Sequence, residues 1–342
     1  MQIQLSILPD FSLQCLNTFG LDARARAYLR VTCVDQLAAV MADPQLSAMP
    51  RLVLGGGSNI VLTGDVDALV LHMCIEGKAI VGHEHGCTLV RSGAGENWHA
   101  FVQYTLAQGL GGLENMALIP GTVGASPIQN IGAYGAEVKD SFHCLTVFDL
   151  ASGQCRTMDA EACRFGYRDS IFKRAEGEGL VIVDVTFALP HAWQPNLRYG
   201  ELAQAVAEAG LEAPTALQIS ALVESIRRRK LPDPTVIGNA GSFFKNPIVS
   251  QQQCAALLDA FPRLVHHAQA DGTEKLAAGW LIDQCGWKGK TMGRAGVYPK
   301  QALVLVNNGG ATGGEVIALA RAIQTDVLAR YGVHLDTEPV LI

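Results

Sequence analysis

The sequence predicts an α+β protein, and three observations lead to this class. Short apolar runs bounded by glycine and polar residues dominate the first half of the chain, which is typical of strands. Apolar residues in the second half recur mostly every three or four positions, which is typical of helices that bury one face. Hydrophobic residues make up 49% of the 342 residues and charged residues 17%, so the chain can bury a large core.

Strands are expected first on both sides of a glycine loop. Apolar runs at 52–54 and 60–62 flank the sequence GGGSN at 55–59, which predicts a strand, a tight loop and a second strand. Further strands are expected from the apolar runs at 88–90, within 144–189 (above all at 180–185), and near 241–245 and 302–306.

Helices are predicted where apolar residues recur at helical spacing. In the segment that begins at Trp98 the apolar residues share one face, and Gly109 ends the pattern. The run LPDP at 231–234 ends another helix, because proline cannot continue one. The predicted helices cover about 98–106, 201–209, 219–230, 250–260, 273–285 and 314–331.

Composition and charge exclude several classes of protein. The formal net charge of −6 provides no overall basic surface for nucleic acid or an anionic membrane, and no stretch approaches the roughly 18 apolar residues of a membrane span. Residues 1–5 show no signal-peptide pattern. The nine cysteines are scattered and no CxxC occurs, which favours reduced thiols in the cytoplasm over a disulfide framework.

Two glycine-rich segments can bring backbone close to a ligand. The GGGSN loop offers successive backbone N–H groups to a phosphate or forms a plain tight hairpin, and the residues alone leave both open. The segment IPGTVGASPIQNIGAYG at 119–135 has four glycines and two prolines and no clear period. Long irregular segments of this kind usually serve function. A ligand such as a flat polar ring or a pyrophosphate is therefore favoured over a purely structural loop.

Other reactive residues give weaker signals. Ser242 lies in a glycine-flanked, aromatic turn and can act as a proton donor or nucleophile, or can simply cap a turn. The residues at 83–87 suit a surface hairpin better than a metal site, and His266 and His267 are expected to be solvated, so no metal site is predicted. The run RRRK at 227–230 favours a phosphate site or a helix C-terminus over a nucleic-acid patch.

Several long motifs spread over nearly the whole chain carry a family resemblance. They are NTFG at 17–20, GGGSN at 55–59, SGAGENW at 92–98, IPGTVGASPIQNIGAYG at 119–135, YRDSIFK at 167–173, KLPDP at 230–234, GNAGSFFKNP at 238–247, AAGWLIDQCGWKG at 277–289 and LDTEP at 335–339. In this order they resemble the UDP-N-acetylenolpyruvoylglucosamine reductases, flavoenzymes of bacterial peptidoglycan synthesis. So many motifs in one order make a chance match untenable.

The resemblance implies a flavin-binding fold of the vanillyl-alcohol-oxidase (PCMH) type, followed by a C-terminal α/β substrate-binding domain. An extra segment at about 173–203 contains Arg198-Tyr199-Gly200 and resembles the type I branch, in which a tyrosine loop covers the substrate. The implied divisions are FAD-binding subdomain 1 at 1–62, FAD-binding subdomain 2 at 63–222 and the substrate-binding domain at 223–335, with residues 336–342 packing back near the active site.

The resemblance also implies FAD, bound non-covalently, and NADPH as co-substrate. Tyr199, Lys230, Asn246 and Lys275 would contact the UDP-sugar or NADPH. The implied FAD-binding residues, many of which would act through backbone N–H groups, are Gly55, Gly56, Gly57, Ser58, Asn59, Ile60, Pro120, Gly121, Gly124, Ala125, Ile128, Gln129, Asn130, Gly132, Ala133 and Tyr134.

The implied reaction is the NADPH-dependent reduction of UDP-N-acetylglucosamine enolpyruvate to UDP-N-acetylmuramate. Hydride would reach C3 of the enolpyruvyl group, and negative charge would spread from C2 into the carboxylate as an enolate. Arg168 and Glu338 match the pair that stabilises this enolate, so Glu338 would be protonated or held against Arg168. Ser242 matches the serine that protonates C2, and Lys230 would orient that serine or bind phosphate.

Two alternative functions and two departures from the family pattern accompany this resemblance. An FAD oxidase or dehydrogenase of the same fold would act on another substrate, and a flavin or UDP-sugar binding protein would show no turnover.

The chain stops four residues after Glu338, which is therefore expected close to a frayed end. Ser126 stands where many relatives have alanine. A monomer without nucleic-acid or membrane partners is expected.

Overall fold

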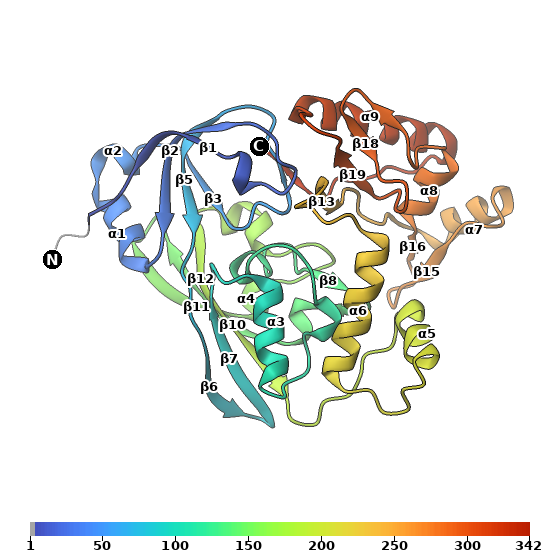
Figure 1. Cartoon of the computed structure of the whole chain (residues 1–342), viewed down its shortest axis with the longest axis horizontal. Coiled ribbons are helices and arrows are strands. Elements are labelled where there is room, and N and C mark those ends of the chain that lie inside the picture. Colours follow the sequence, from blue (N-terminus) through green and yellow to red (C-terminus); the bar gives the residue numbers. More distant parts are fainter. Residues whose placement is uncertain (1–3) are drawn as a thin grey trace. The chain divides into compact units, whose positions relative to one another are not determined.

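The computed structural model describes residues 4–342, which form two compact units (Figure 1). Unit 1 comprises the described part of 1–11 together with 25–56 and 67–229, and unit 2 comprises 12–24, 57–66 and 230–342. Residues 1–3, part of the segment considered for a signal peptide, lie outside the described residues. Each unit therefore draws on segments that are far apart in the sequence.

Unit 1 contains two sheets that share a core. The four-stranded sheet has the order β1 (Leu8–Ser12), β2 (Arg24–Val31), β5 (Val66–Met73) and β3 (Arg51–Leu54), with β3 parallel to β5. Helices α1 (Val34–Ala42) and α2 (Pro44–Ser47) connect β2 to β3. The buried side chains of Leu29, Leu37 and Leu69 join those of Phe148 and Val181 from the second sheet in one hydrophobic cluster.

The second sheet is antiparallel and supports a helix on one face. Its order is β11 (Gln154–Asp159), β10 (Phe142–Asp149), β12 (Leu180–Pro190), β7 (Cys87–Gly93) and β6 (Lys78–Glu84). Helix α3 (Trp98–Ala107) packs on β12, with the rings of Trp98 and Phe101 at 5.8 Å and 5.3 Å from that of Phe187. These large aromatic side chains form the centre of the second core, because each buries much apolar area.

The remaining elements of unit 1 are short, apart from α5 and α6. Between α3 and β10 the backbone forms no long regular element, as the glycine and proline content of 119–135 predicts. These elements are η2 (Glu114–Met116), η3 (Val123–Ala125), β8 (Gly132–Ala133), β9 (Ala136–Glu137), η4 (Val138–Asp140), α4 (Ala160–Cys163), η5 (Ile171–Lys173), η6 (Ala175–Gly177), α5 (Gly200–Glu208) and α6 (Ala216–Lys230).

Unit 2 contains two small sheets and a strand pair. One sheet has the order β13 (Gly238–Ser242), β19 (Val304–Asn307), β18 (Ala295–Val297) and β17 (Thr291–Met292); the other has the order β14 (Ile248–Val249), β16 (Glu274–Leu276) and β15 (His266–Ala268). Strand β20 (Val340–Leu341) runs parallel to β4 (Ile60–Val61). The helical elements are η1 (Gln14–Leu16), α7 (Gln251–Ala260), α8 (Ala278–Gln284) and α9 (Gly313–Tyr331).

The strongest helical patterns and the two strands that flank the GGGSN loop are confirmed, whereas one helix is predicted too long. The predicted helices at 98–106, 219–230 and 314–331 correspond to α3, α6 and α9. The helix predicted at 273–285 begins only at Ala278, because Glu274–Leu276 pairs as a strand with both β14 and β15. The runs around GGGSN do not form a hairpin, since β3 pairs with β5 and β4 with β20. The surface hairpin at 83–87 is confirmed as the turn between β6 and β7.

No helix among residues 4–342 is both long and apolar enough to span a membrane.

A buried turn at Asn17–Gly20 joins the three segments of unit 2. The Asn17 side chain holds the turn, because its Nδ2 donates to the Leu13 and Leu21 carbonyls at 2.9 Å and its Oδ1 accepts from the Leu21 N–H. Thr18 N–H donates to the Gly57 carbonyl at 3.1 Å, and Thr18 Oγ1 donates to the Asn239 carbonyl at 2.6 Å. The NTFG motif therefore forms a structural connection within unit 2.

Gly57 is the position at which this connection tolerates least change. Its φ is +58°, and a Cβ added there would lie 1.9 Å from the Leu16 carbonyl oxygen. Any side chain would therefore meet both a left-handed backbone and a backbone atom that cannot move alone.

We expect Gly57→Ala to lower the free energy of unfolding by about 3 kcal/mol, from the left-handed strain and the clash together. Gly332→Ala is the matched control, because Gly332 has φ +63° and open space around it, so it should lose only about 1 kcal/mol. Urea unfolding of both variants measures the difference. Equal losses of unfolding free energy in the two variants would show that the clash with Leu16 adds nothing to the destabilisation.

Candidate functional site

A cavity of about 210 Å³ in unit 1 is lined by four of the predicted FAD-binding residues: Gly55, Gly124, Ala125 and Ile128. Its volume is below the 300–1,000 Å³ usual for a whole drug-sized ligand, so it would hold one part of a larger molecule. The wall is mostly apolar, which suits a flat aromatic ring. The other lining residues are Val53, Met73, Ala94, Thr122, Phe172, Leu180 and Ile182.

The motif at 92–98 holds the loop at 120–125 in place. Gly124 N–H donates to the Ala94 carbonyl at 2.9 Å, and Trp98 N–H donates to the Gly121 carbonyl at 3.0 Å. A Cβ on Gly124 would lie 2.4 Å from the Ala94 Cβ, so only glycine permits this packing. The SGAGENW motif thus supports the cavity wall through backbone hydrogen bonds.

Thr122 is a lining residue that the sequence analysis did not select. Its Oγ1 is buried and has no hydrogen-bond partner among the described residues. A Cβ on Gly55 would lie only 2.7 Å from this oxygen, so the absence of a side chain at Gly55 leaves the hydroxyl room at the cavity edge. Buried hydroxyls are normally paired, and an unpaired one costs about 1–3 kcal/mol. Its partner is therefore expected to be a ligand.

Backbone strain is concentrated in the same part of unit 1. Asn130, Tyr134 and Arg168 are predicted site residues, and all three adopt left-handed backbone with φ of +45°, +50° and +53°. Leu118, close to the 119–135 segment, has φ +60°. Such conformations cost of order 1–3 kcal/mol each and persist only where the surroundings enforce them, often at functional sites.

Asn130 enforces the conformation of the Arg168 loop. Its side chain is fully buried, and Nδ2 donates to the Gly166 carbonyl at 3.0 Å and to Glu137 Oε2 at 2.9 Å, while Oδ1 accepts from Lys139 N–H. Arg168 in turn donates from Nη2 to the Gly132 carbonyl at 2.8 Å. The two loops therefore hold each other, and the hydrogen bonds of the Asn130 amide fix the arrangement of the site.

The predicted tyrosine loop lies against the 119–135 segment. The ring of Tyr199 meets that of Tyr134 edge-to-face at 5.1 Å, and the Tyr199 residue is 43% exposed. Asn115 connects the two backbones, since its Nδ2 donates to the carbonyls of both Tyr134 and Asn196. Its Oδ1 is buried without a partner among the described residues. Burial also raises the pKa of Tyr134 to about 12, so this phenol stays neutral at physiological pH.

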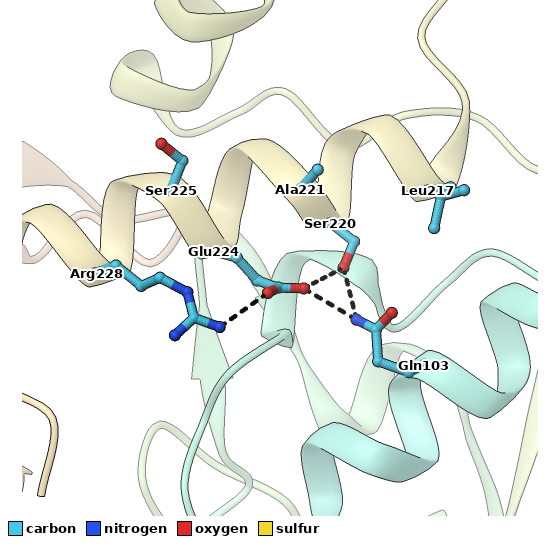
Figure 2. Close-up of a pocket in the computed structure, with 7 residues that line it drawn as sticks. All are labelled: Gln103, Leu217, Ser220, Ala221, Glu224, Ser225 and Arg228. Atoms are coloured by element: carbon cyan, nitrogen blue, oxygen red, sulfur yellow. Dashed lines mark hydrogen bonds and ion pairs between the residues drawn. The ribbon is translucent and has the colours of Figure 1, made fainter.

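Helix α6 is anchored on α3 and carries a half-buried arginine. Figure 2 shows Gln103 of α3 hydrogen-bonded to both Ser220 and Glu224 of α6, and these two bonds fix the helices together. Arg228 pairs with Glu224 and Arg229 with Glu201, so these two cations of the RRRK run are compensated. The depression drawn in Figure 2 contains none of the predicted cofactor or substrate residues.

Arg227 differs from its neighbours in that run. Its Nε is buried without a hydrogen-bond partner among the described residues, and burial lowers the pKa of its guanidinium. Tyr134 is close enough to interact with it electrostatically. A buried cation needs an anion or a polar acceptor, which makes Arg227 a candidate ligand-binding residue. The sequence analysis considered a phosphate site at this run but did not single out Arg227.

In unit 2 the structure brings Ser242 and Glu338 onto adjacent backbone segments. Glu338 N–H donates to the Phe243 carbonyl at 2.8 Å, and Phe244 and Thr337 form an antiparallel bridge. Ser242 ends β13, where its pairing with β19 is irregular and Gly241 has φ +69°. Two of the three predicted catalytic residues therefore lie together, whereas Arg168 belongs to unit 1.

Backbone and side-chain hydrogen bonds fix the chain at and just after Glu338, in contrast to the frayed end expected from its position. Asn59 Nδ2 donates to the Glu338 carbonyl at 3.2 Å, and the Asn59 carbonyl accepts from Val340 N–H at 3.0 Å. Strand β20 then pairs with β4, which follows directly after the GGGSN loop. The predicted FAD-binding residues Gly57, Ser58, Asn59 and Ile60 thus belong to the same unit as Glu338.

The predicted substrate-binding residues Lys230, Asn246 and Lys275 belong to unit 2, whereas Tyr199 belongs to unit 1. Lys230 ends α6, and Lys275 lies on β16 opposite Ile248 and His267. Asn246 Oδ1 accepts from Ala278 N–H at 3.0 Å, at the start of α8. Part of the Asn246 side chain is therefore committed to structure, and its Nδ2 is the group able to donate to a ligand.

Comparisons with known proteins decide the family. Residues 25–159 match the sequence model described as FAD binding domain, and residues 233–342 match that described as UDP-N-acetylenolpyruvoylglucosamine reductase, C-terminal domain. The chain is 55% identical to the UDP-N-acetylenolpyruvoylglucosamine reductase of Burkholderia mallei (strain NCTC 10229), over 99% of this chain and 98% of that protein. The chain belongs to the UDP-N-acetylenolpyruvoylglucosamine reductase family.

Further members of the reductase family agree with this assignment. The enzyme of Paraburkholderia phymatum is 55% identical over 99% of this chain and 98% of that protein. The crystal structure of the reductase from Thermus caldophilus has a TM-score of 0.69 at 24% identity, over 99% of this chain and 98% of that chain, which establishes the likeness of fold. The α+β fold with an FAD-binding domain is thereby confirmed.

The residues that line the cavity fit FAD, the cofactor for which the domain matched at 25–159 is named. The cavity lies within unit 1, its apolar wall suits a ring system, and Gly55 leaves space beside it. The unpaired Thr122 hydroxyl supplies a donor or acceptor at the edge. Thr122 was missed because a threonine within a long motif gives no signal of its own. Its unpaired state appears only when Gly55 and Thr122 come together in the fold.

We expect Thr122→Val to weaken FAD binding about tenfold, because one ligand hydrogen bond is worth about 0.5–1.5 kcal/mol. The stability of the FAD-free protein should stay the same or rise, since the unpaired hydroxyl disappears. Flavin fluorescence titration and urea unfolding measure the two effects.

Ser126→Ala is the matched control. Ser126 is also a buried hydroxyl residue of this segment, but its Oγ already donates to the Val123 carbonyl at 2.7 Å. This variant should lose about 1 kcal/mol of stability and keep its FAD affinity. If Thr122→Val and Ser126→Ala changed FAD affinity and stability alike, Thr122 would not belong to the ligand site.

Proposed function

We propose that this chain reduces UDP-N-acetylglucosamine enolpyruvate to UDP-N-acetylmuramate, with NADPH as the reductant and FAD as the resident cofactor, in peptidoglycan precursor synthesis. The observation that carries the proposal is the 55% identity to reductases of this name over 99% of the chain. The match spans both the FAD-binding domain and the C-terminal domain that belongs to this family.

The FAD-binding residues divide by the way in which they would act. Bound FAD would supply the hydride-transfer chemistry that links NADPH to C3 of the enolpyruvyl group. Gly55, Gly124 and Ala125 would hold it through backbone groups and close packing at the cavity, and Thr122 through its hydroxyl. The remaining predicted residues, from Gly56 to Ile60 and from Pro120 to Tyr134, keep the roles that their motifs imply.

Substrate binding requires cations for the diphosphate and donors for the carboxylate. Lys230 and Lys275 supply point charges, and Arg227 supplies a guanidinium whose buried Nε has no partner among the described residues. Tyr199 packs edge-to-face on Tyr134 and is itself exposed, which suits a residue that covers the bound UDP-sugar or NADPH. Asn246 would donate through Nδ2.

The chemical step places negative charge on the enolpyruvyl group, and the chain must stabilise that charge and deliver a proton. Arg168, in the motif YRDSIFK, provides the fixed positive charge for the carboxylate of the enolate, and Glu338 acts with it. Ser242 transfers its Oγ proton to C2, which completes the addition of hydride and proton across the double bond. The backbone bonds that join the Ser242 and Glu338 segments support a shared role.

We also propose a location, a range of partners and an oligomeric state for this chain. A nucleotide-sugar substrate and a nicotinamide reductant favour the bacterial cytoplasm, and all nine cysteines are free in the structure. The net charge of −6 argues against nucleic acid as a partner. A monomer is proposed.

An anaerobic visible spectrum of the purified protein tests the function directly. We expect the flavin absorbance to fall on addition of NADPH and to return when UDP-N-acetylglucosamine enolpyruvate is added. Absorbance that falls without returning would indicate a flavin enzyme with another substrate. A folded protein that binds flavin but does not respond to NADPH would indicate a binding protein.

We expect Ser242→Ala to keep the NADPH step and to slow the return of flavin absorbance by 10²–10⁴-fold, because general acid catalysis typically contributes that much. Ser225→Ala is the control, since Ser225 lies on the exposed face of α6 outside the proposed site. Stopped-flow absorbance separates the two steps. Equal slowing of both steps by Ser242→Ala would indicate a structural role for the serine.

A further inference from the structure

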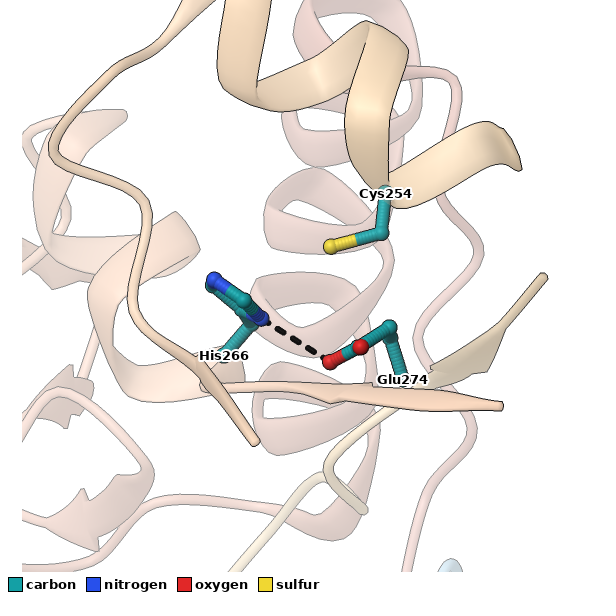
Figure 3. Close-up of side chains that lie close together, drawn as sticks. All are labelled: Cys254, His266 and Glu274. Carbon is teal, nitrogen blue, oxygen red and sulfur yellow. Dashed lines mark hydrogen bonds and ion pairs between the residues drawn. The ribbon is translucent and has the colours of Figure 1, made fainter. Parts of the chain in front are cut away.

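Three potential metal ligands converge in unit 2, away from the residues assigned to FAD. Cys254 lies on α7, His266 on β15 and Glu274 on β16. Figure 3 shows the three side chains pointing toward one another. Cys254 is 2% exposed, while His266 and Glu274 are half-buried, so the cluster has a closed inner side and a route to solvent.

The strand register explains why the histidine and glutamate meet. Ala268 pairs with Glu274 and His266 pairs with Leu276, so His266 and Glu274 are diagonal neighbours on one face of the β15–β16 pair. The His266 Nδ1 lies 2.9 Å from Glu274 Oε2. The expectation that His266 is solvated is wrong for this reason, whereas His267 is exposed.

The third ligand comes from the helix packed beside this pair. Ser250 caps α7 by accepting from Gln253 N–H, which fixes the first turn of the helix and the position of Cys254 within it. The Cys254 Sγ, a His266 ring nitrogen and a Glu274 carboxylate oxygen all lie within 4.8 Å of one another. Three elements thus supply one sulfur, one nitrogen and one oxygen donor.

We propose that Cys254, His266 and Glu274 bind a divalent cation of borderline softness, Zn²⁺ above all, with water in the fourth position. A mixed thiolate, imidazole and carboxylate set suits Zn²⁺ better than Mg²⁺ or Ca²⁺, which prefer oxygen ligands alone. No metal was expected at these residues from the sequence.

The geometry needs only a small adjustment to accept the ion. Zn–S bonds of roughly 2.3 Å and Zn–N or Zn–O bonds of roughly 2.0–2.2 Å place tetrahedral ligand atoms about 3.3–3.6 Å apart. The cluster must therefore contract by no more than about 1.5 Å at its widest, and the His266–Glu274 pair must open slightly. The ion takes the place of the proton that those two side chains share.

A simple histidine–glutamate hydrogen bond does not account for Cys254. Burial and the nearby Glu274 carboxylate raise the pKa of the Cys254 thiol, so without a cation it stays protonated beside a polar pair. A divalent ion reverses this electrostatic effect, because it favours thiolate, neutral imidazole and carboxylate together.

Titration of the FAD-containing full chain with Co²⁺ tests the proposal, because a thiolate ligand gives Co²⁺ an intense near-ultraviolet charge-transfer band and tetrahedral geometry gives strong visible bands. The protein must carry no histidine tag. We expect both sets of bands to appear at one Co²⁺ per chain and to disappear when Zn²⁺ is added. Failure of the wild-type chain to produce them would overturn the proposal.

Variants identify the ligands. Cys254→Ser should abolish the charge-transfer band, and Glu274→Gln should weaken Co²⁺ binding at least tenfold. The controls are Cys285→Ser, a half-buried cysteine elsewhere in unit 2, and His267→Gln, the exposed neighbour of His266; both should bind like wild type. Unchanged bands in Cys254→Ser, or their loss in both controls, would refute the site.

The test is independent of the proposed enzymatic function. Retained flavin absorbance and an unchanged melting temperature in the absence of metal show that each variant is folded. Zn²⁺ should raise the melting temperature of the wild-type chain and of both controls, but not of Cys254→Ser or Glu274→Gln, since a ligand stabilises only the state that binds it. Equal shifts in all five proteins would mean that Zn²⁺ acts elsewhere.

Discussion

The backbone connection at Asn17–Gly20 is the constraint on which unit 2 depends. Hydrogen bonds from this turn reach the glycine loop at Gly57 and the start of β13 at Asn239, and the Phe19 carbonyl accepts from Asn307 of β19. Backbones can approach so closely only where a side chain is absent: a Cβ on Gly238 would lie 2.2 Å from the Phe19 carbonyl oxygen. The strand that ends in Ser242 is therefore oriented by a turn more than two hundred residues earlier.

In unit 1, strained backbone and buried polar atoms without hydrogen-bond partners gather around the candidate site. Left-handed backbone at Asn130, Tyr134 and Arg168 is held by the hydrogen bonds of Asn130 and by the packing of Tyr134 on Tyr199. Thr122 and Arg227 keep buried polar atoms without partners among the described residues. Both features cost stability, and a bound ligand would recover part of that cost. Preorganisation of this kind is what a site that stabilises a developing charge requires.

Sequence patterns predicted those parts of the structure that local interactions determine. Helices α3, α6 and α9 follow from apolar spacing, and the loop at 119–135 follows from its glycines and prolines. Motifs also located Ser242 and Glu338, which the fold places on adjacent segments. The helix predicted at 273–285 was too long, because pairing of β16 with two neighbouring strands outweighs helical propensity. Arg227 was not distinguished from its neighbours, since burial depends on tertiary packing. His266 was placed in solvent for the same reason, because Cys254 and Glu274 reach it only through the fold.

The composition of unit 2 from three separate stretches limits how genes of this type can recombine. A single crossover near codon 230 would join a foreign 230–342 segment to the resident 12–24 and 57–66 segments. Such a chimera keeps its fold only if both parents share the turn at Asn17–Gly20 and the glycine loop that contacts it. Exchange of this unit among bacterial lineages is therefore expected to proceed by whole-gene transfer rather than by mosaic genes. Block-swapping libraries for directed evolution should accordingly move the three stretches together.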